Sequence, residues 1–256
     1  MRVAALYDIH GNLPALEAVL GELQSVGVDR LVVGGDFIWG PFPTETIDLM
    51  RELGDRAVII AGNSDREVVD RLDVTGELPP HLVAPVRWTR ERLRCDQLEF
   101  VSALAKTCVL DVEGLGATLF CHATPRSDEE LITRSTPDYA VAEVLATAEQ
   151  RVVVCGHTHM QYDRASKDWR IINPGSVGMP YEREPGAYWA LLGPDVRLRK
   201  TTYDVRAAVE RIRATGFPHA RFGDILLSPP RQEEMVESFE EQRRRAVEAA
   251  SDPGHA

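Results

Sequence analysis

The first 65 residues alternate short apolar runs with segments of helical periodicity, and this alternation restricts the fold more than any other feature of the sequence. The run "RVAALY" ends at Asp8, and apolar residues then recur at helical spacing, at Leu16, Val19, Leu20 and Leu23. The pattern repeats with "RLVVGG" and the helix-like "TETIDLMREL", and the run "RAVIIAG" follows. Strands that alternate with helices in this way form βαβ units, so we expect a parallel sheet at the start of the chain.

The rest of the chain adds helices and antiparallel strands. Residues 64–105 predict a mostly helical insertion, and the runs "TCVLDV" and "ATLFC" around Gly114 and Gly116 predict a hairpin. Residues 137–149 and 204–214 predict helices, and the segments "QYDRASKDWRIINPG" and "AYWALLGPDVRLRKTTY" predict two more hairpins. We expect one domain over residues 1–229 and a polar helical tail over residues 230–256.

Composition and charge exclude several classes of protein. No apolar stretch approaches the roughly 18 residues of a membrane span, and "MRVAALYDIHGN" lacks the features of a signal peptide, so we expect a cytoplasmic protein. The net charge of -11 argues against binding to polymeric nucleic acid or to anionic membranes, which need a cationic surface. A small anionic substrate would therefore need a local positive centre. The four cysteines are irregularly spaced and predict buried free thiols.

Polar side chains follow the apolar runs at the points where the expected strands end. They are Asp8 and His10 in "YDIHGN", Asp36 in "GGDFIWGP", Asn63 in "AGNSD", His122 in "LFCHATP", and His157 and His159 in "CGHTH". Ligands bind beyond the carboxyl ends of strands in open α/β sheets, so these loops could meet at one site. In extended backbone, His157 and His159 would point the same way. This mixture of nitrogen and oxygen ligands suits a pair of divalent metals.

Each of these residues also has a structural interpretation. Asp8 could cap a turn, Asn63 could be a turn residue, and a single histidine such as His122 is more often a hydrogen-bonded structural residue than a ligand. For each residue taken alone, the structural interpretation is favoured over the interpretation as a metal ligand. The ordered series favours a metal site, because every polar group stands at a strand end and two pairs have a spacing of two.

The ordered motifs "DIHGN", "GGD", "GNSD", "CH" and "GHTH" resemble those of the calcineurin-like metallophosphoesterase superfamily, in particular its small bacterial phosphodiesterase branch. The segments "GDFIWGPFP" and "INPGSVGMP" are similar to that branch as well, so the resemblance spans residues 1 to about 200. The segment "YDVRAAVERIRATGFP" more weakly resembles relatives that include asymmetrical diadenosine tetraphosphate hydrolases. The resemblance implies an α/β fold, a four-layer αββα sandwich with two mixed β-sheets and a small helical insertion.

The resemblance also implies a reaction and a ligand set. Asp8, His10 and His159 would hold one divalent metal, Asn63, His122 and His157 would hold a second, and Asp36 would bridge the two. Of these residues, Asp36, Asn63 and His122 would also count as catalytic. A hydroxide bridging the metals would attack phosphorus in a phosphodiester or a nucleotide phosphoanhydride. Mn²⁺ is the first choice of metal, with Fe, Zn, Co or Ni as alternatives.

The sequence departs from the wider superfamily at Ser64, where many members have a histidine that stabilises the transition state or protonates the leaving oxygen. A serine hydroxyl is a poor acid, so the loss in hydrolysis rate should be smallest for substrates whose leaving group has a low pKa. Asp65 could orient His10 or a water, or could simply begin a helix.

Four residues are candidates for substrate contacts. Arg126 could bind a phosphate or pair with Asp128 or Glu129; Trp39 and Phe42 could stack on a base or pack in the core; Asn12 could support the site by a hydrogen bond or a turn. We expect a small phosphoester or nucleotide substrate and no polymeric nucleic acid or membrane, and the oligomeric state stays open. A protein serine/threonine phosphatase and a metal-free protein-binding scaffold are the alternative functions.

Overall fold

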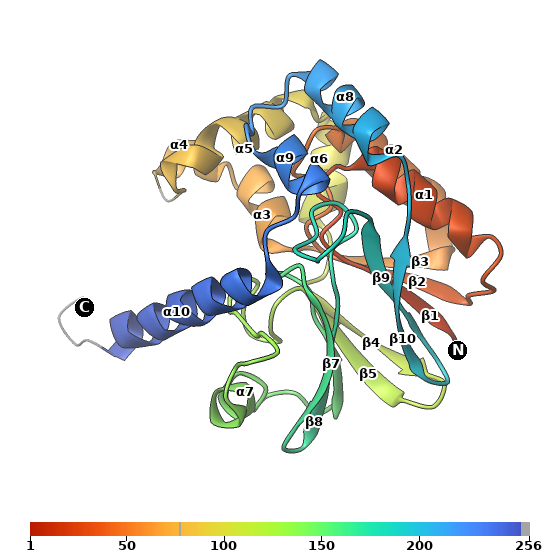
Figure 1. Cartoon of the computed structure of the whole chain (residues 1–256), viewed down its shortest axis with the longest axis vertical. Coiled ribbons are helices and arrows are strands. Elements are labelled where there is room, and N and C mark those ends of the chain that lie inside the picture. Colours follow the sequence, from red (N-terminus) through yellow and green to blue (C-terminus); the bar gives the residue numbers. More distant parts are fainter. Residues whose placement is uncertain (77, 252–256) are drawn as a thin grey trace.

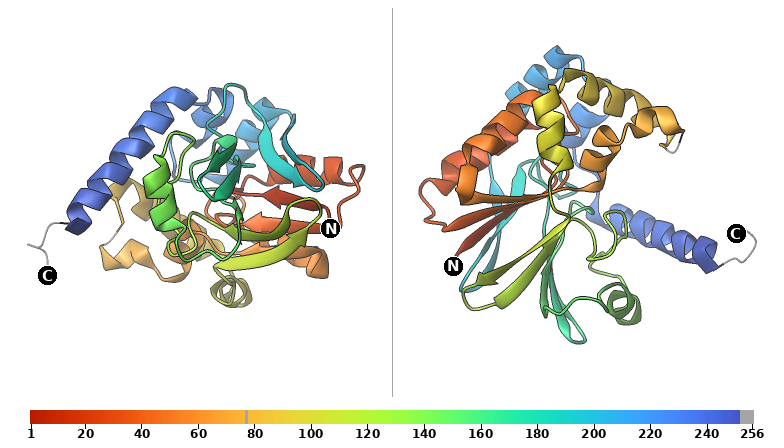
Figure 2. Two further views of the ribbon diagram at one scale, coloured as in Figure 1. Left: turned by 90° about the horizontal axis from the view of Figure 1, so that it is seen from below. Right: turned by 180° about the vertical axis from the view of Figure 1, so that it is seen from behind.

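The computed structural model describes residues 1–76 and 78–251, which form two five-stranded mixed sheets that face each other, with helices outside them (Figures 1 and 2). The first sheet, in the order β10-β9-β1-β2-β3, consists of β1 (Val3–Leu6), β2 (Arg30–Gly34), β3 (Ala57–Ile60), β9 (Ala187–Leu192) and β10 (Val196–Thr201). The second, in the order β4-β5-β6-β8-β7, consists of β4 (Thr107–Val112), β5 (Gly116–Cys121), β6 (Val152–Val154), β7 (Gln161–Ser166) and β8 (Trp169–Pro174). The predicted fold class, a four-layer α/β sandwich, is confirmed.

The strand pairs include those predicted from the periodicity of the sequence. The expected βαβ units are present, because β1 pairs in parallel with β2 and β2 pairs in parallel with β3. The three expected hairpins are also present, as the antiparallel pairs β4 with β5, β7 with β8 and β9 with β10. In addition, β9 pairs antiparallel with β1, so the last hairpin joins the first sheet.

Helices connect the strands and cover both sheets. In the described residues they are α1 (Leu13–Leu23), α2 (Pro43–Glu52), η1 (Gly54–Arg56), α3 (Asn63–Val69), α4 (Leu72–Thr75), α5 (Pro80–Arg92), α6 (Cys95–Ser102), α7 (Asp138–Val144), α8 (Val205–Thr215), α9 (Phe222–Leu227) and α10 (Gln232–Ser251). The helix α7 ends at Val144 and is followed by turns, so it is shorter than the range 137–149 expected from the sequence. Within the described residues, no helix combines the length and the apolar character needed to cross a lipid bilayer.

Three apolar clusters hold the layers together. Successive residues of a strand point to opposite faces, so Val3 and Ala5 pack between the two sheets while Ala4 and Leu6 pack beneath the helices of the first sheet. Burial on both faces explains why β1 and β2 read as nearly continuous apolar runs. A third cluster, which includes Val153 and Val141, joins the second sheet to α7.

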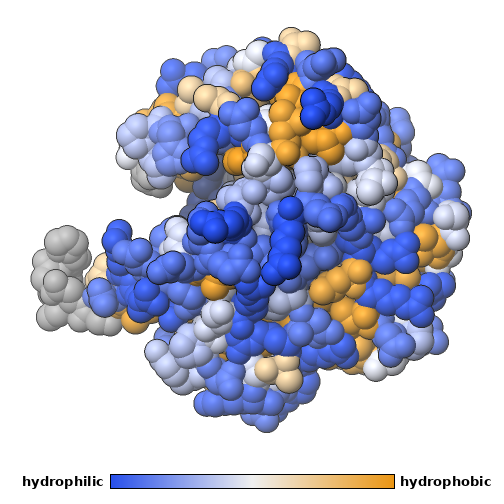
Figure 3. All heavy atoms as spheres, in the orientation of Figure 1, coloured by the Kyte–Doolittle hydropathy of each residue, from blue (hydrophilic) through white to orange (hydrophobic). Residues whose placement is uncertain are grey.

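The cysteines and the last helix complete the fold. All four cysteines are free, as predicted, but the predicted burial is confirmed only for Cys121 and Cys155. Cys108 is partly exposed, and for the exposed Cys95 the prediction of burial is wrong. The helix α10 leaves the body of the molecule (Figure 1), and Figure 3 shows a recess between it and the helical lobe that contains α4. The first half of α10 is anchored, since Gln232, Val236 and Glu240 are buried.

Candidate metal centre

The seven predicted ligands lie beyond the carboxyl ends of five strands and converge between the two sheets. Asp8 and His10 follow β1, Asp36 follows β2, Asn63 follows β3, His122 follows β5, and His157 and His159 follow β6. Six of them form two groups whose potential ligand atoms lie within 4.8 Å of one another, Asp8 with His10 and His159, and Asp36 with His122 and His157. Parallel strands put their carboxyl ends on one edge of a sheet, which is why loops distant in sequence meet here.

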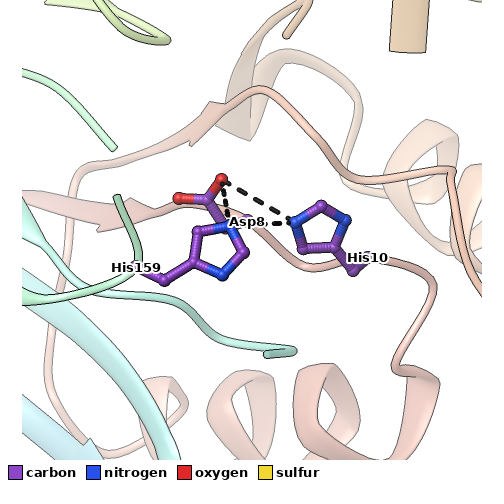
Figure 4. Close-up of side chains that lie close together, drawn as sticks. All are labelled: Asp8, His10 and His159. Carbon is purple, nitrogen blue, oxygen red and sulfur yellow. Dashed lines mark hydrogen bonds and ion pairs between the residues drawn. The ribbon is translucent and has the colours of Figure 1, made fainter. Parts of the chain in front are cut away.

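The first group consists of Asp8, His10 and His159 (Figure 4). The Nε2 atoms of His10 and His159 lie 3.2 Å apart, and His159 Nε2 lies 3.3 Å from Asp8 Oδ1. Asp8 Oδ1 is buried and has no hydrogen-bond partner among the described residues. A buried carboxylate oxygen that faces two imidazole nitrogens and lacks a donor is an arrangement that a cation can satisfy.

The second group is joined to the first by Asp36. One carboxylate oxygen of Asp36 lies 3.4 Å from His122 Nε2, and the other lies 3.8 Å from His10 Nε2. Asn63 also belongs here, because its Oδ1 lies 3.1 Å from His122 Nε2. Asp36 thus faces both groups, which is the position that a bridging ligand needs.

Hydrogen bonds to the far sides of the ligands fix their orientation. His122 Nδ1 lies 2.9 Å from the carbonyl oxygen of Gly34, and His159 Nδ1 lies 2.7 Å from that of Met179, so both rings present Nε2 to the site. The amide nitrogen of Asn63 donates to Glu67 Oε1 at 3.1 Å, which turns the amide oxygen toward the ligand groups. A metal would meet donors that the protein already holds in place.

The backbone at these loops is left-handed rather than extended. Positive φ angles occur at Asp8 (53°), His10 (48°), Asp36 (53°), His157 (64°) and His159 (59°). The expectation that His157 and His159 converge through extended backbone is therefore wrong; His157 lies with the second group and His159 with the first. Such angles are unfavourable for residues other than glycine and persist only where the surrounding structure imposes them, as it often does at functional sites.

Two glycines allow the loops to approach the ligands closely. A Cβ atom on Gly62 would lie 2.1 Å from Asp36 Oδ1, and one on Gly156 would lie 2.6 Å from Asp8 Oδ2. Neither distance is sterically possible, so any side chain at these positions would displace a carboxylate of the site.

Asp65 holds the loop that carries Asp36. Its buried carboxylate accepts hydrogen bonds from the backbone N–H groups of Asp36 (2.8 Å), Phe37 (3.0 Å), Ile38 (3.1 Å) and Gly62 (2.9 Å). The hydrogen bond from Gly62 is the contact expected if Asp65 begins a helix. The other hydrogen bonds of this carboxylate go to the backbone of the Asp36 loop and not to His10. Burial and the neighbouring Asp36 carboxylate raise the pKa of Asp65 to about 7, against the lowering effect of the N–H groups.

Protonation of the metal-free site follows the same division into two groups. Burial lowers the pKa of His10 and of His157 to about 4. Burial also opposes the charged form of His122, but the Asp36 carboxylate outweighs it and raises the pKa of His122 to about 10. The Asp8 carboxylate likewise raises the pKa of His159. Each group thus pairs one carboxylate with one histidine that keeps a proton, which a metal would have to displace.

Two of the candidate substrate-contact residues are buried. Asn12 is fully buried; its amide nitrogen donates to the Gly178 carbonyl and its oxygen caps α1 at Ala15. Trp39 is 4% exposed and packs edge-on against His10, with ring centroids 5.4 Å apart. Asn12 thus forms the expected supporting hydrogen bond, and Trp39 packs in the core, which was one of its two interpretations. Contact of either residue with a substrate stays a prediction.

Phe42 and Arg126 have protein partners of their own. Phe42 packs against the core, and the guanidinium of Arg211 lies 5.6 Å from its ring centroid. Arg126 forms an ion pair with Glu130 at 2.7 Å, so the expected pairing with Asp128 or Glu129 is wrong. Those two acids instead bind Arg66, which follows the Asn63 loop. Contacts of Phe42 and Arg126 with a substrate also stay predictions.

Sequence reasoning missed an aromatic side chain on the first ligand group. Tyr181 stacks on His159 with ring centroids 4.8 Å apart, and Phe239 of α10 lies 6.2 Å beyond Tyr181. Tyr181 follows the segment "INPGSVGMP" directly, which was the only sequence signal for it. The last helix therefore contributes to the surroundings of the metal centre.

Comparison with known proteins agrees with this geometry. Residues 1–193 of the 256 match the model of the calcineurin-like phosphoesterase superfamily domain. The chain belongs to this superfamily. The family expected from the motifs is confirmed, and the matched residues include every predicted metal ligand.

Individual known proteins resemble the chain over most of its length. The Methanocaldococcus jannaschii protein MJ0912 is 26% identical over 240 residues, which cover 84% of this chain and 93% of that protein. Phosphodiesterase YfcE of Escherichia coli is 24% identical over 200 residues, which cover 75% of this chain and 87% of YfcE. The crystal structure of PH1004 from Pyrococcus horikoshii superposes with a TM-score of 0.79 at 23% identity, covering 90% of this chain and 99% of that one. This last similarity supports the fold.

Proposed function

We propose that the protein is a dimetal-dependent phosphoester hydrolase that acts on a phosphodiester or on a nucleotide phosphoanhydride. The observation that supports it best is the pair of buried ligand groups, with Asp36 facing both. One carboxylate between two sets of histidines is a ligand arrangement suited to two neighbouring cations.

The residues present fit two divalent ions. Asp8, His10 and His159 would hold one, and Asn63, His122 and His157 would hold the other. Their mixture of imidazole, carboxylate and amide ligands suits Mn²⁺, our first choice, and also accommodates Fe, Zn, Co or Ni. When bound, two such ions supply an activated water for attack on phosphorus and positive charge for the phosphoryl oxygens.

The protein's own groups would position the reactants. Asp36, Asn63 and His122 would act as catalytic residues, because they line the place where the two ligand groups meet. Ser64 stands where many superfamily members have a histidine, and its Oγ is buried with no hydrogen-bond partner among the described residues. Its weak acidity makes substrates with good leaving groups the preferred class.

Two further considerations favour a small substrate. The relative YfcE is named a phosphodiesterase. The net charge of -11 opposes the approach of a long polyanion, whereas a nucleotide-sized substrate needs only the local positive charge of the metal centre.

The test is metal analysis followed by kinetics. The protein loaded with Mn²⁺ should hold two ions per chain by elemental analysis and should hydrolyse bis(p-nitrophenyl) phosphate. Phosphopeptides and oligonucleotides, compared at equal metal and salt, should give a lower kcat/KM than dinucleoside polyphosphates. Failure to bind metal would favour a protein-binding scaffold, and preference for the phosphopeptide would favour a protein phosphatase.

A further inference from the structure

His159, in the first ligand group, is held at three points by the segment 179–182. The carbonyl oxygen of Met179 lies 2.7 Å from His159 Nδ1, and the backbone N–H of Tyr181 donates to the His159 carbonyl at 3.1 Å. The Tyr181 ring also stacks on the imidazole, with ring centroids 4.8 Å apart and an interplanar angle of 23°. These contacts fix the far ring nitrogen, the ring face and the left-handed backbone (φ 59°) of one predicted ligand.

The other histidine of the first group, His10, is held less firmly (Figure 4). Its Nδ1 is buried and has no hydrogen-bond partner among the described residues, and the edge-on ring of Trp39 is 5.4 Å away between centroids. A metal-binding histidine is normally oriented by a hydrogen bond at its second ring nitrogen. Of the two imidazoles in this group, His159 is therefore the one that the protein orients in advance.

An aromatic contact connects the segment 179–182 to the last helix. Phe239 of α10 lies 6.2 Å from Tyr181 between ring centroids, at an interplanar angle of 33°. Tyr181 thus contacts both a helix side chain and the ligand His159. Because protein interiors are closely packed, truncation of Phe239 would leave space into which the Tyr181 ring can move away from the imidazole.

A chain of hydrogen bonds makes a second connection to α10. Gln232, the first residue of the helix, donates to one carboxylate oxygen of Glu182, and the other oxygen accepts from the backbone N–H of Gln161 at 2.6 Å. Gln161 follows His159 by two positions, so this chain holds the backbone just beyond the ligand. Gln232 and Glu182 are both buried, and hydrogen bonds are stronger where water is excluded.

The helix α10 is itself fixed close to these contacts. The buried carboxylate of Glu240, next to Phe239 in the chain, accepts hydrogen bonds from the hydroxyls of Thr133, at 2.7 Å, and Thr136. Phe239 therefore supports Tyr181 from a fixed position. The helix starts at Gln232, whereas the match to the superfamily ends at residue 193, so this support comes from outside the matched domain.

The second ligand group is oriented by residues inside the matched domain. His122 Nδ1 lies 2.9 Å from the Gly34 carbonyl oxygen, and the side-chain amide of Asn63 donates to Glu67 at 3.1 Å. The two groups therefore depend on different parts of the chain, and a change in α10 should affect them unequally.

We propose that α10 positions the ligand His159, through Tyr181 and Glu182, and thereby raises the metal affinity of the first ligand group without changing that of the second. The proposal rests on the metal binding in the proposed function. It goes beyond that function because it gives a role at the metal centre to a helix that carries none of the seven predicted ligands. Phe239 and Gln232 are positioning residues, since they act through the segment 179–182.

The test is calorimetric titration of Mn²⁺ into the full-length, metal-free protein. The wild type should bind two ions. Phe239→Ala should weaken the binding of one ion about tenfold and leave the other within about twofold, because losing the support behind a metal-binding histidine typically costs about 10–100-fold in affinity. Gln232→Ala, which breaks the other connection, should weaken the same ion.

Two ligand variants identify the ion that is weakened. His157→Ala removes a ligand of the second group, and His159→Ala removes one of the first. Phe239→Ala should weaken Mn²⁺ binding about tenfold when combined with His157→Ala, and should have no effect when combined with His159→Ala. Tyr181→Phe keeps the stacked ring and should keep both affinities, whereas Tyr181→Ala should weaken the same ion as Phe239→Ala does.

Val247→Ala is the matched control. Val247 is an apolar residue of the same helix, 51% exposed and further from the helix start than the buried Glu240, so its truncation should leave both affinities unchanged. Thermal unfolding in EDTA checks that each variant is folded. Unchanged affinities in Phe239→Ala and Gln232→Ala, or equal losses at both ions, would overturn the proposal. A wild type that binds no Mn²⁺ would instead contradict the proposed function, and the proposal with it.

Discussion

Asp65→Ala should destabilise the protein and remove at least one metal from the candidate centre, although Asp65 is not a predicted ligand. The substitution leaves four buried N–H groups without an acceptor, those of Asp36, Phe37, Ile38 and Gly62. An unsatisfied buried donor costs about 1–3 kcal/mol, and entering water can compensate part of this, so we expect a loss of about 4 kcal/mol. For a chain of this size such a loss lowers Tm by about 8–16 °C.

The assay is thermal unfolding in EDTA at pH 8, where the Asp65 carboxylate is ionised, followed by calorimetric titration with Mn²⁺. Since Asp36 keeps its positive φ only while its loop is held, Asp65→Ala should also lose at least one bound metal. Asp70→Ala is the control, because Asp70 is exposed and directly follows the same helix, α3. A stability within about 1 kcal/mol of the wild type, with both metals bound, would refute this reasoning.

Three other side chains lead to separate predictions. Asp36→Asn should lower kcat/KM for bis(p-nitrophenyl) phosphate by about 100-fold or more, because Asp36 faces both ligand groups; full activity with two metals bound would contradict the bridging role. Ser64→His should raise turnover of alkyl relative to aryl phosphodiesters by about tenfold, and an unchanged ratio would mean that another group protonates the leaving oxygen. Burial raises the pKa of Glu182 to about 7, so the folded state binds this proton more tightly than the unfolded state does. The free energy of unfolding of the wild type should therefore fall by on the order of 2–3 kcal/mol between about pH 4.5 and pH 7. Glu182→Gln should not show this fall when both proteins are unfolded with urea across that pH range. Equal pH dependence of the two proteins would be evidence against the prediction.

The sequence alone determined the kinds of element and the set of polar residues at their ends. Alternation of apolar runs with helical periodicity is a local property, so the parallel strands β1, β2 and β3 and the three hairpins could be predicted from it. The seven candidate ligands could be identified for the same reason, since each follows an apolar run directly. The family followed from the order of their motifs.

Only the tertiary structure decided how those residues act together. The separation of His157 from His159 depends on left-handed backbone that neighbouring loops impose, and no periodicity of the chain encodes such backbone. The action of Asp65 on the Asp36 loop joins residues 29 positions apart, and the stacking of Tyr181 on His159 depends on the path of the loop after β8. These features arise from contacts between distant segments, and such contacts exist only after the two sheets have packed against each other.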